Sequence, residues 1–238
     1  MNGIIGIAGV VTLLLLVGGG LGLARRDQFS AKWLFAAVGL VIINDVMLTR
    51  GYGALPELLP ASAWNWQGKI LALAATLVIA ALPAFGWRRS GLTIRQAQGS
   101  LPRCLPVALL YCLFFAGLAY ILPNDPPTTE TVAFQLTMPG IEEEAFYRGI
   151  LLLALDRAFL ARWRFLGVDW GWGALLSSAL FGLAHAFGYA HGSFSFDPLT
   201  MALTALPALI AVWLRLRTGS VLIPIVLHNI GNLLALFA

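Results

Sequence analysis

The sequence predicts an all-α fold, a polytopic bundle of about eight helices that span a membrane. Of the 238 residues 59% are apolar, and the mean hydropathy is +0.84, far above the level of an ordinary soluble domain. The apolar residues gather in runs of about 20 residues or slightly fewer, long enough for a helix to cross the hydrocarbon core of a bilayer. Because lipid offers the backbone no hydrogen-bond partners, we expect these runs to be helical.

The predicted spans follow one another along the chain, and we interpret residues 1–238 as a single membrane domain without repeats. In chain order they are Ile4–Leu23, Trp33–Leu48, Ile70–Gly86, Leu105–Leu122, Gly140–Phe159, Trp172–Phe187, Leu199–Leu214 and Val221–Phe237. The fifth span could begin earlier, near Val132. Asn124–Gly140 is expected to be a loop followed by a short interfacial helix. Phe187–Pro198 mixes turn residues with aromatic residues, and could be either a mobile cover over a site or a plain connector.

Basic residues are concentrated in every second loop. Twelve of the 15 Lys and Arg residues lie there, namely Arg25, Arg26, Lys32, Arg88, Arg89, Arg95, Arg103, Arg157, Arg162, Arg164, Arg215 and Arg217. The other loops carry only Arg50 and Lys69. Loops rich in Lys and Arg stay in the cytoplasm, so both termini are predicted to lie outside it. We expect a multi-pass protein of a prokaryotic inner membrane, in contact with membrane lipids. Its net charge of +4 comes from flanking loops and does not indicate a nucleic-acid partner.

The stretch Gly140–Leu153, GIEEEAFYRGILLL, places Glu142, Glu143, Glu144 and Arg148 inside a predicted span of a chain that is only 11% charged. Each charge at the centre of a membrane helix costs roughly 2.5–3.5 kcal/mol, so these groups need partners or a place at the boundary. Glu144 and Arg148 are four residues apart, share a helix face and can pair. Glu143 points about 100° away and stays available for chemistry. Alternatively, the acidic residues only begin a helix, where they complement its dipole.

Polar residues in three other spans could join this cluster. His185 closes the sixth span, and His228 and Asn232 share one face of the eighth. By their depth, Glu143, His185, His228 and Asn232 can meet in the outer half of the bilayer. Asp45 could join them or cap its own loop. Each histidine alone could instead form a hydrogen bond between helices.

These residue types suit the attack of water on a peptide carbonyl. A carboxylate and a histidine can activate a water, a His–Asn pair can donate to a developing oxyanion, and an arginine can orient a second carboxylate. The sequence contains neither G-x-S-x-G nor H-E-x-x-H. Zinc bound by a glutamate and the two histidines is an alternative that the sequence leaves open.

In order along the chain, E-E-x-x-x-R (Glu143, Glu144, Arg148), F-x-x-x-H (Phe181, His185) and H-x-x-x-N (His228, Asn232) resemble the three motifs of the CAAX protease and bacteriocin-processing family. The resemblance covers about 139–232. It implies a glutamic intramembrane endopeptidase built as an eight-helix bundle with a water-filled cavity. Glu143 and His185 would activate water, Glu144 and Arg148 would organise the site, and His228 and Asn232 would bind the oxyanion. Phe181 is a candidate substrate contact, and no metal or other cofactor is implied.

The expected substrate is a peptide or protein with a membrane-associated tail, either a prenylated C-terminus, a leader peptide or a C-terminal sorting tail. Two rival functions use the same bundle. One is a non-enzymatic immunity or binding protein, which would not need both a water-activating pair and an oxyanion pair. The other is a small proton-coupled transporter with a Glu/His relay, which broken helices or inverted repeats would support.

Overall fold

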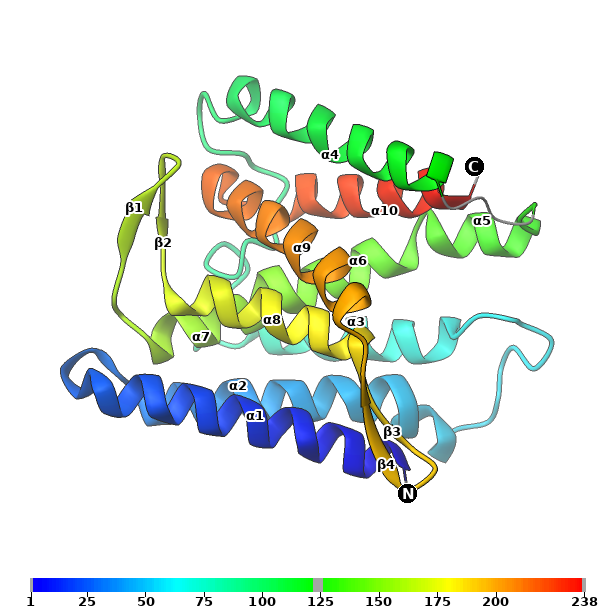
Figure 1. Cartoon of the computed structure of the whole chain (residues 1–238), viewed down its shortest axis with the longest axis horizontal. Helices are drawn as coiled ribbons and strands as arrows, with labels where there is room; N and C mark the ends of the chain where they lie inside the picture. The colour runs from blue at the N-terminus through cyan, green and yellow to red at the C-terminus, as the bar shows by residue number, and fades with distance from the viewer. Residues whose placement is uncertain (1, 122–125, 237–238) are drawn as a thin grey trace.

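A computed structural model describes residues 2–121 and 126–236, most of which form helices that lie roughly along one direction (Figure 1). The long helices are α1 (Asn2–Ala24), α2 (Ala31–Val46), α3 (Trp66–Ala81), α4 (Leu101–Ile121), α8 (Trp172–Ala186), α9 (Pro198–Thr218) and α10 (Leu222–Leu236). Shorter helices are α5 (Thr129–Gln135), α6 (Met138–Glu144) and α7 (Leu152–Ala158). The π-helical segments η2 (Met47–Gly51) and η4 (Ala145–Leu151) extend α2 and join α6 to α7. Short 3-10 turns are η1 (Arg26–Gln28) and η3 (Tyr52–Ala54).

The predicted all-α bundle is confirmed, and each predicted span overlaps a helix. Within residues 2–121 and 126–236, four helices are long and apolar enough to cross a membrane by length and composition, namely α1, α2 extended to Thr49, α4 and α9. Helices α3, α8 and α10 are apolar but shorter. The predicted fifth span is the continuous unit of α6, η4 and α7. The predicted ends at Leu122 and Phe237, and the loop start at Asn124, lie outside the described residues.

Polar side chains cap the N-termini of three of these helices. They accept hydrogen bonds from backbone N–H groups that have no partner within the first helical turn. Asn65 accepts from Gly68 at the start of α3, and Thr128 accepts from Thr131 at the start of α5. Asp197 accepts from Leu199 and Thr200 at the start of α9. The hydrogen bonds from Thr200 and from the backbone lower the pKa of Asp197, which lies just outside its span. The expected short helix before the glutamates is α5.

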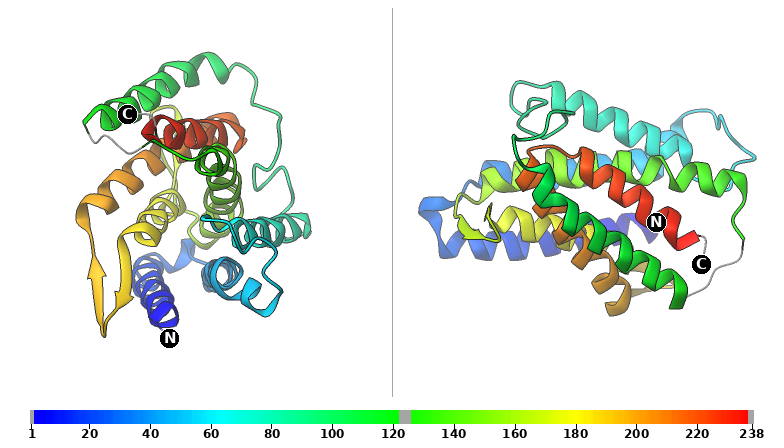
Figure 2. Two further views of the ribbon diagram at one scale, coloured as in Figure 1. Left: turned by 90° about the vertical axis from the view of Figure 1, so that its right-hand side faces the viewer. Right: turned by 90° about the horizontal axis from the view of Figure 1, so that it is seen from above.

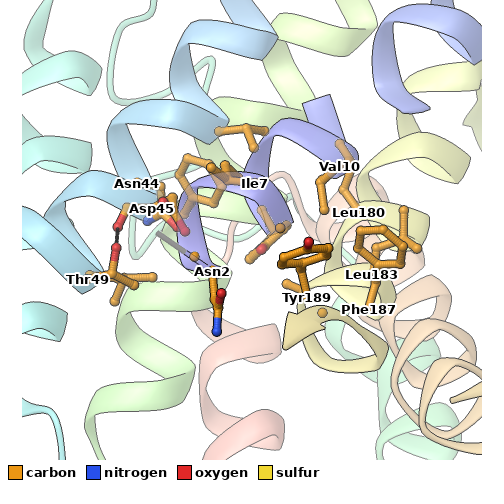
Figure 3. A pocket seen from close by; sticks show the side chains of 18 residues that line it. Asn2, Ile7, Val10, Asn44, Asp45, Thr49, Leu180, Leu183, Phe187 and Tyr189 are labelled. Carbon is orange, nitrogen blue, oxygen red and sulfur yellow. Dashed lines mark hydrogen bonds between the residues drawn. The ribbon is translucent and has the colours of Figure 1, made fainter. Parts of the chain in front are cut away.

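Two β-hairpins lie at opposite ends of the bundle (Figure 1). One pairs β1 (Trp163–Phe165) with β2 (Val168–Trp170) at the end that carries the basic loops. The other pairs β3 (Phe187–Ala190) with β4 (Ser193–Phe196), so Phe187–Pro198 is an ordered hairpin that packs against α1. Together with α1, α2 and α8 the second hairpin encloses a cavity of about 330 Å³ (Figure 3).

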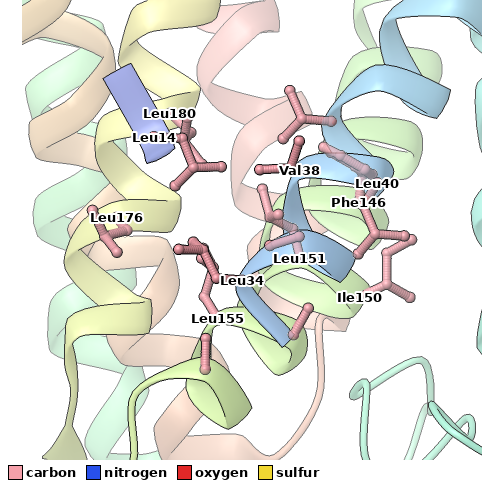
Figure 4. Close-up of a cluster of buried hydrophobic side chains, with 14 of the residues drawn as sticks. Leu14, Leu34, Val38, Leu40, Phe146, Ile150, Leu151, Leu155, Leu176 and Leu180 are labelled. Carbon is pink, nitrogen blue, oxygen red and sulfur yellow. The ribbon is translucent and has the colours of Figure 1, made fainter. Parts of the chain in front are cut away.

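The central core lies between α1, α2, α8 and the segment from η4 to α7 (Figure 4). Ile150, Leu151 and Leu155 are fully inaccessible to solvent, and Leu14 of α1 and Leu34 of α2 pack in the same cluster. Viewed end-on, the continuous unit of α6, η4 and α7 runs through the middle of the bundle (Figure 2). The three glutamates lie directly before this core segment, so its packing fixes their position.

The N-terminus of α6 touches α10 at a glycine. Gly140 N–H donates to Asn229 Oδ1 at 2.8 Å, and Asn229 Nδ2 donates to Thr137 O at 3.2 Å. A methyl group at position 140 would lie 2.3 Å from Asn229 Oδ1 and 2.7 Å from the backbone oxygen of Ile225. Because both helices are packed on other neighbours, only a glycine allows this approach.

We therefore expect Gly140→Ala to destabilise the protein by about 1–3 kcal/mol, the usual cost of overpacking. The measurement is thermal unfolding in detergent, with Gly117→Ala as the matched control. Gly117 also lies in a helix, α4, but an added methyl group there meets nothing within 4 Å. Equal melting temperatures of the two variants would show that α6 and α10 do not depend on this contact.

Candidate active site

The three consecutive glutamates of α6 have different partners, as their 100° spacing on a helix predicts. Glu144 faces α10 and Arg148, Glu142 faces α2 and α3, and Glu143 lies between them. Glu142, Glu144 and Arg148 are fully buried, and the side chain of Glu143 is 13% exposed. The cluster is therefore an interior site and not a set of acidic residues at a solvated helix start.

The predicted pair of Glu144 and Arg148 is present. Arg148 Nε lies 3.2 Å from Glu144 Oε2, and the other oxygen, Oε1, lies 2.8 Å from His228 Nδ1. The guanidinium group of Arg148 is also 4.3 Å above the ring of Phe181, which is a cation–π distance. One oxygen of Glu144 thus has a hydrogen bond and the other has only an ion pair, with Arg148. A carboxylate held from two sides suits an orienting role more than that of a proton acceptor.

Glu142 is held by two residues of the N-terminal helices. Asn44 Nδ2 donates to Glu142 Oε1 at 2.7 Å, and Lys69 Nζ lies 2.7 Å from Glu142 Oε2. Asn44 itself is buried, and only 13% of the Lys69 side chain is exposed. The sequence places Lys69 in a loop; this expectation is wrong, because Lys69 belongs to the first turn of α3 and points into the cluster.

Glu143 is not paired with Arg148, as predicted, but it is not entirely free. Its Oε1 accepts a hydrogen bond from Lys69 Nζ at 2.6 Å. Its Oε2 is buried without a hydrogen-bond partner and lies 3.7 Å from His228 Nε2. Thus one oxygen of this carboxylate is fixed by a cation, while the other keeps its lone pairs and faces a histidine across a gap that a water could bridge.

The hydrogen bonds of the two histidines determine which ring nitrogen carries a proton. His185 Nδ1 lies 2.9 Å from Phe181 O, and a carbonyl oxygen can only accept, so Nδ1 is the donor. The neutral ring of His185 then has its lone pair on Nε2. His228 Nδ1 donates to the carboxylate of Glu144 in the same way. In the doubly protonated form of the ring, Nε2 of His228 is a donor as well.

Asn232 lies one turn beyond His228 on α10 and donates through Nδ2 to Gln135 Oε1 at 3.0 Å. An amide nitrogen has two hydrogens, so one remains for another acceptor. Gln135 ends α5, which is fastened to the loop before α3 because Glu130 accepts from Ser62, Ala63 and Trp66. Hydrogen bonds from Ser62 and from the backbone of Ala63 lower the pKa of Glu130, which lies outside the spans.

A cavity of about 160 Å³ brings most of the predicted residues together. Its polar wall contains Glu144, Arg148, His185, His228 and Asn232, and its other walls come from α4, α8 and α9. Phe181 forms part of the wall, with its ring centroid 4.7 Å from that of His185 and 6.0 Å from that of His228. Glu143 does not line the cavity, but its Oε2 meets the cavity wall at His228.

Asp45 is not part of this cavity. It lines the separate 330 Å³ cavity beside α1 together with Asn44, Thr49 and apolar residues of α8 (Figure 3). Among the residues that the structure describes, no three His, Cys, Asp or Glu side chains are placed to hold a metal ion.

Sequence reasoning missed Lys69, Asn44, Gln135 and Asn229. Asn44 lies beside Asp45 in an apolar helix, where a polar residue signals that a partner exists but not which one. Lys69 directly precedes an apolar run, and the sequence alone therefore places it in a loop. Gln135 and Asn229 carry a weaker signal, their closeness in sequence to a predicted motif.

The comparisons with known proteins agree with this geometry. A family model described as "Type II CAAX prenyl endopeptidase Rce1-like" matches residues 126–234, which include all three motifs. No curated protein and no solved structure matches the chain. The family match implies protease activity in general terms, and the apolar helices indicate an integral membrane protein. The resemblance found in the motifs is thereby confirmed over residues 126–234, where the chain is similar to the Rce1-like family of type II CAAX prenyl endopeptidases.

Proposed function

We propose that this protein is an intramembrane endopeptidase of the glutamic type, in which Glu143 and His185 activate a water. One observation carries the proposal. Glu143 Oε2 is buried without a hydrogen-bond partner and faces His228 beside a cavity that the other motif residues line. A carboxylate with an open lone pair in a dry interior is suited to accept a proton.

The hydrogen-bond pattern supports a division of labour between the two histidines. Glu143 Oε2 and His185 Nε2 are both acceptors, so together they can receive the two hydrogens of one water. As the water oxygen attacks the carbonyl carbon of the peptide, Glu143 takes one proton. The same proton is then transferred to the nitrogen of the leaving amine, so that Glu143 is a carboxylate again at the end of the reaction.

The negative charge that develops on the carbonyl oxygen needs donors. His228, whose Nδ1 contacts Glu144, supplies one donor through Nε2–H when both ring nitrogens carry a proton. The second Nδ2 hydrogen of Asn232 supplies another. Arg148 helps to orient His228, because Glu144 contacts both residues. Acceptors for water and donors for an oxyanion around one cavity support an enzyme over a non-enzymatic immunity protein or a proton-coupled transporter.

The cavity is smaller than the roughly 300–1,000 Å³ of typical ligand pockets, so a peptide can enter only when a wall moves. Asn232 lines this cavity and also an outer groove with Thr128, Thr131 and Gln135. The bond between Gln135 and Asn232 thus lies where the two spaces meet. We propose that a membrane-associated tail reaches the site from this end, as a prenylated C-terminus, a leader peptide or a sorting tail, with Phe181 as a substrate contact.

We expect Glu143→Gln to reduce cleavage of a defined substrate by at least about 100-fold, because glutamine keeps the size but cannot accept the proton. The measurement is turnover in detergent or liposomes, with unfolding checked by thermal melting. Glu57→Gln makes the same change on an exposed loop residue and should behave like the wild type. Near-wild-type turnover of Glu143→Gln would remove Glu143 as the base.

We also expect activity without a metal. The proposed mechanism needs only protein groups, so exhaustive chelation followed by metal analysis should leave turnover unchanged. Loss of activity that stoichiometric zinc restores would instead favour a zinc site built from glutamate and histidine.

We also expect a defined orientation in a prokaryotic inner membrane. The loops with twelve basic residues lie at one end of the bundle, while α5 and the β3–β4 hairpin lie at the other (Figure 1). Basic loops stay in the cytoplasm, so the site should open outward. In a cysteine-free background, a membrane-impermeant thiol reagent on intact cells should label a cysteine at Ser193 and not one at Arg164. Both positions are exposed, and the reverse pattern would direct the site towards cytoplasmic substrates.

A further inference from the structure

Lys69 comes from a part of the chain that the family match does not cover, yet it contacts two of the motif glutamates. Its Nζ lies 2.7 Å from Glu142 Oε2 and 2.6 Å from Glu143 Oε1. Both contacts are hydrogen bonds as well as ion pairs. An ammonium group has three hydrogens, and here two of them are directed at neighbouring carboxylates of one helix.

The contact makes the two oxygens of Glu143 different. Oε1 is fixed by Lys69, so Oε2 is the oxygen that faces His228 Nε2 at 3.7 Å. Glu142 cannot swing away with the lysine, because Asn44 holds its other oxygen at 2.7 Å. Asn44 and Lys69 thus form a support on α2 and α3 that sets the direction of the Glu143 carboxylate.

Charge balance gives Lys69 a second role. The cluster contains the carboxylates of Glu142, Glu143 and Glu144, against the basic groups of Arg148 and Lys69. A proton on His228 would complete the balance. Without Lys69, two buried carboxylates would have lost their cation, which is a costly arrangement in a medium of low dielectric constant.

We propose that Lys69 is a positioning residue of the active site, which holds Glu143 through one oxygen so that the other is presented to the reacting water. The inference rests on the proposed function of Glu143. It adds that the N-terminal helices contribute to the geometry of the site and do not only enclose it.

The test compares Lys69→Met with Lys32→Met, since Lys32 is the other lysine of the chain and is exposed on α2. Turnover of a defined substrate is measured in detergent. We expect Lys69→Met to lower kcat about 10- to 100-fold with KM within about twofold, because displacing a reacting group by an ångström costs about that much. Lys32→Met should retain the wild-type kcat.

Lys69→Met could unfold because it leaves two carboxylates without a cation, so a second variant keeps the test decisive. Lys69→Met/Glu142→Gln removes one positive and one negative charge together, and we expect it to fold but to keep the low kcat. A third variant restores an ammonium group at position 69. Lys69→Cys, with Cys104 and Cys112 replaced by alanine and the new thiol treated with bromoethylamine, carries an ammonium at almost the original distance. We expect this treatment to recover kcat at least fivefold.

The outcomes separate the inference from the proposed function. A wild-type kcat in the folded Lys69→Met/Glu142→Gln variant, together with an inactive Glu143→Gln variant, would overturn the role of Lys69 and leave the endopeptidase proposal intact. Equal turnover by Glu143→Gln and the wild type would instead overturn the proposed function of Glu143 as the base. A second measurement, which needs no substrate, compares the melting temperatures of Lys69→Met, Glu143→Gln and Lys69→Met/Glu143→Gln. Strictly additive shifts would show that the two side chains are not coupled and would also overturn the inference.

Discussion

The burial of four charges in the middle of an apolar bundle is the constraint on which the rest of this structure depends. A carboxylate removed from water without a partner costs several kcal/mol, and three such groups follow one another on α6. Because they point in different directions, no single neighbour can serve them all. Glu144 pairs with Arg148 and with α10. Glu142 and one oxygen of Glu143 pair with polar side chains of α2 and α3. The helices that pack around α6 therefore supply the partners that these three residues need.

The same constraint explains why one atom stands out. Buried polar atoms in proteins normally have partners, so a buried carboxylate oxygen without one needs an explanation. Glu143 Oε2 and Glu144 Oε2 are both such atoms, but Glu144 Oε2 lies 3.2 Å from Arg148 Nε. Glu143 Oε2 has only His228 Nε2 at 3.7 Å, at the point where α6, α10 and the cavity meet. In a purely structural ion-pair network we would expect this oxygen to accept a hydrogen bond, as both oxygens of Glu142 do. The contrast between Glu142 and Glu143, which are adjacent in sequence, supports the proposal that Glu143 and not Glu142 is the reacting group.

Local regularities of the sequence predicted what depends on a single helix. The pairing of Glu144 with Arg148 follows from a spacing of four residues, and the separate direction of Glu143 follows from the helical angle. The same reasoning placed His228 and Asn232 on one face, and both line the cavity. The starts of the long helices also agree within a few residues, because apolar runs end where polar and turn residues begin.

Contacts between distant helices could not be predicted in this way. A lysine before an apolar run resembles a residue at the membrane boundary, and only the packing of α3 against α6 shows that Lys69 points inward. The π-helical segment η4 is similarly invisible in the sequence, although it begins directly after Glu144 and contains Arg148. Such segments shift the register of a helix and often occur at functional sites. Here the wider turn begins between the paired residues, so the position of Arg148 relative to Glu144 and Phe181 depends on it.

The distribution of partners also bears on what the matched segment could do alone. Residues 126–234 contain every motif residue, but the groups that neutralise Glu142 and hold Glu143 come from residues 44 and 69. A segment limited to the matched residues would keep the Glu144–Arg148–His228 arrangement and lose the cation on Glu142 and Glu143. Two carboxylates side by side in a dry interior would then relieve their repulsion by taking up a proton or by turning towards water. Either response would remove the ionised, directed oxygen on which the proposed reaction depends, so the N-terminal helices are part of the site.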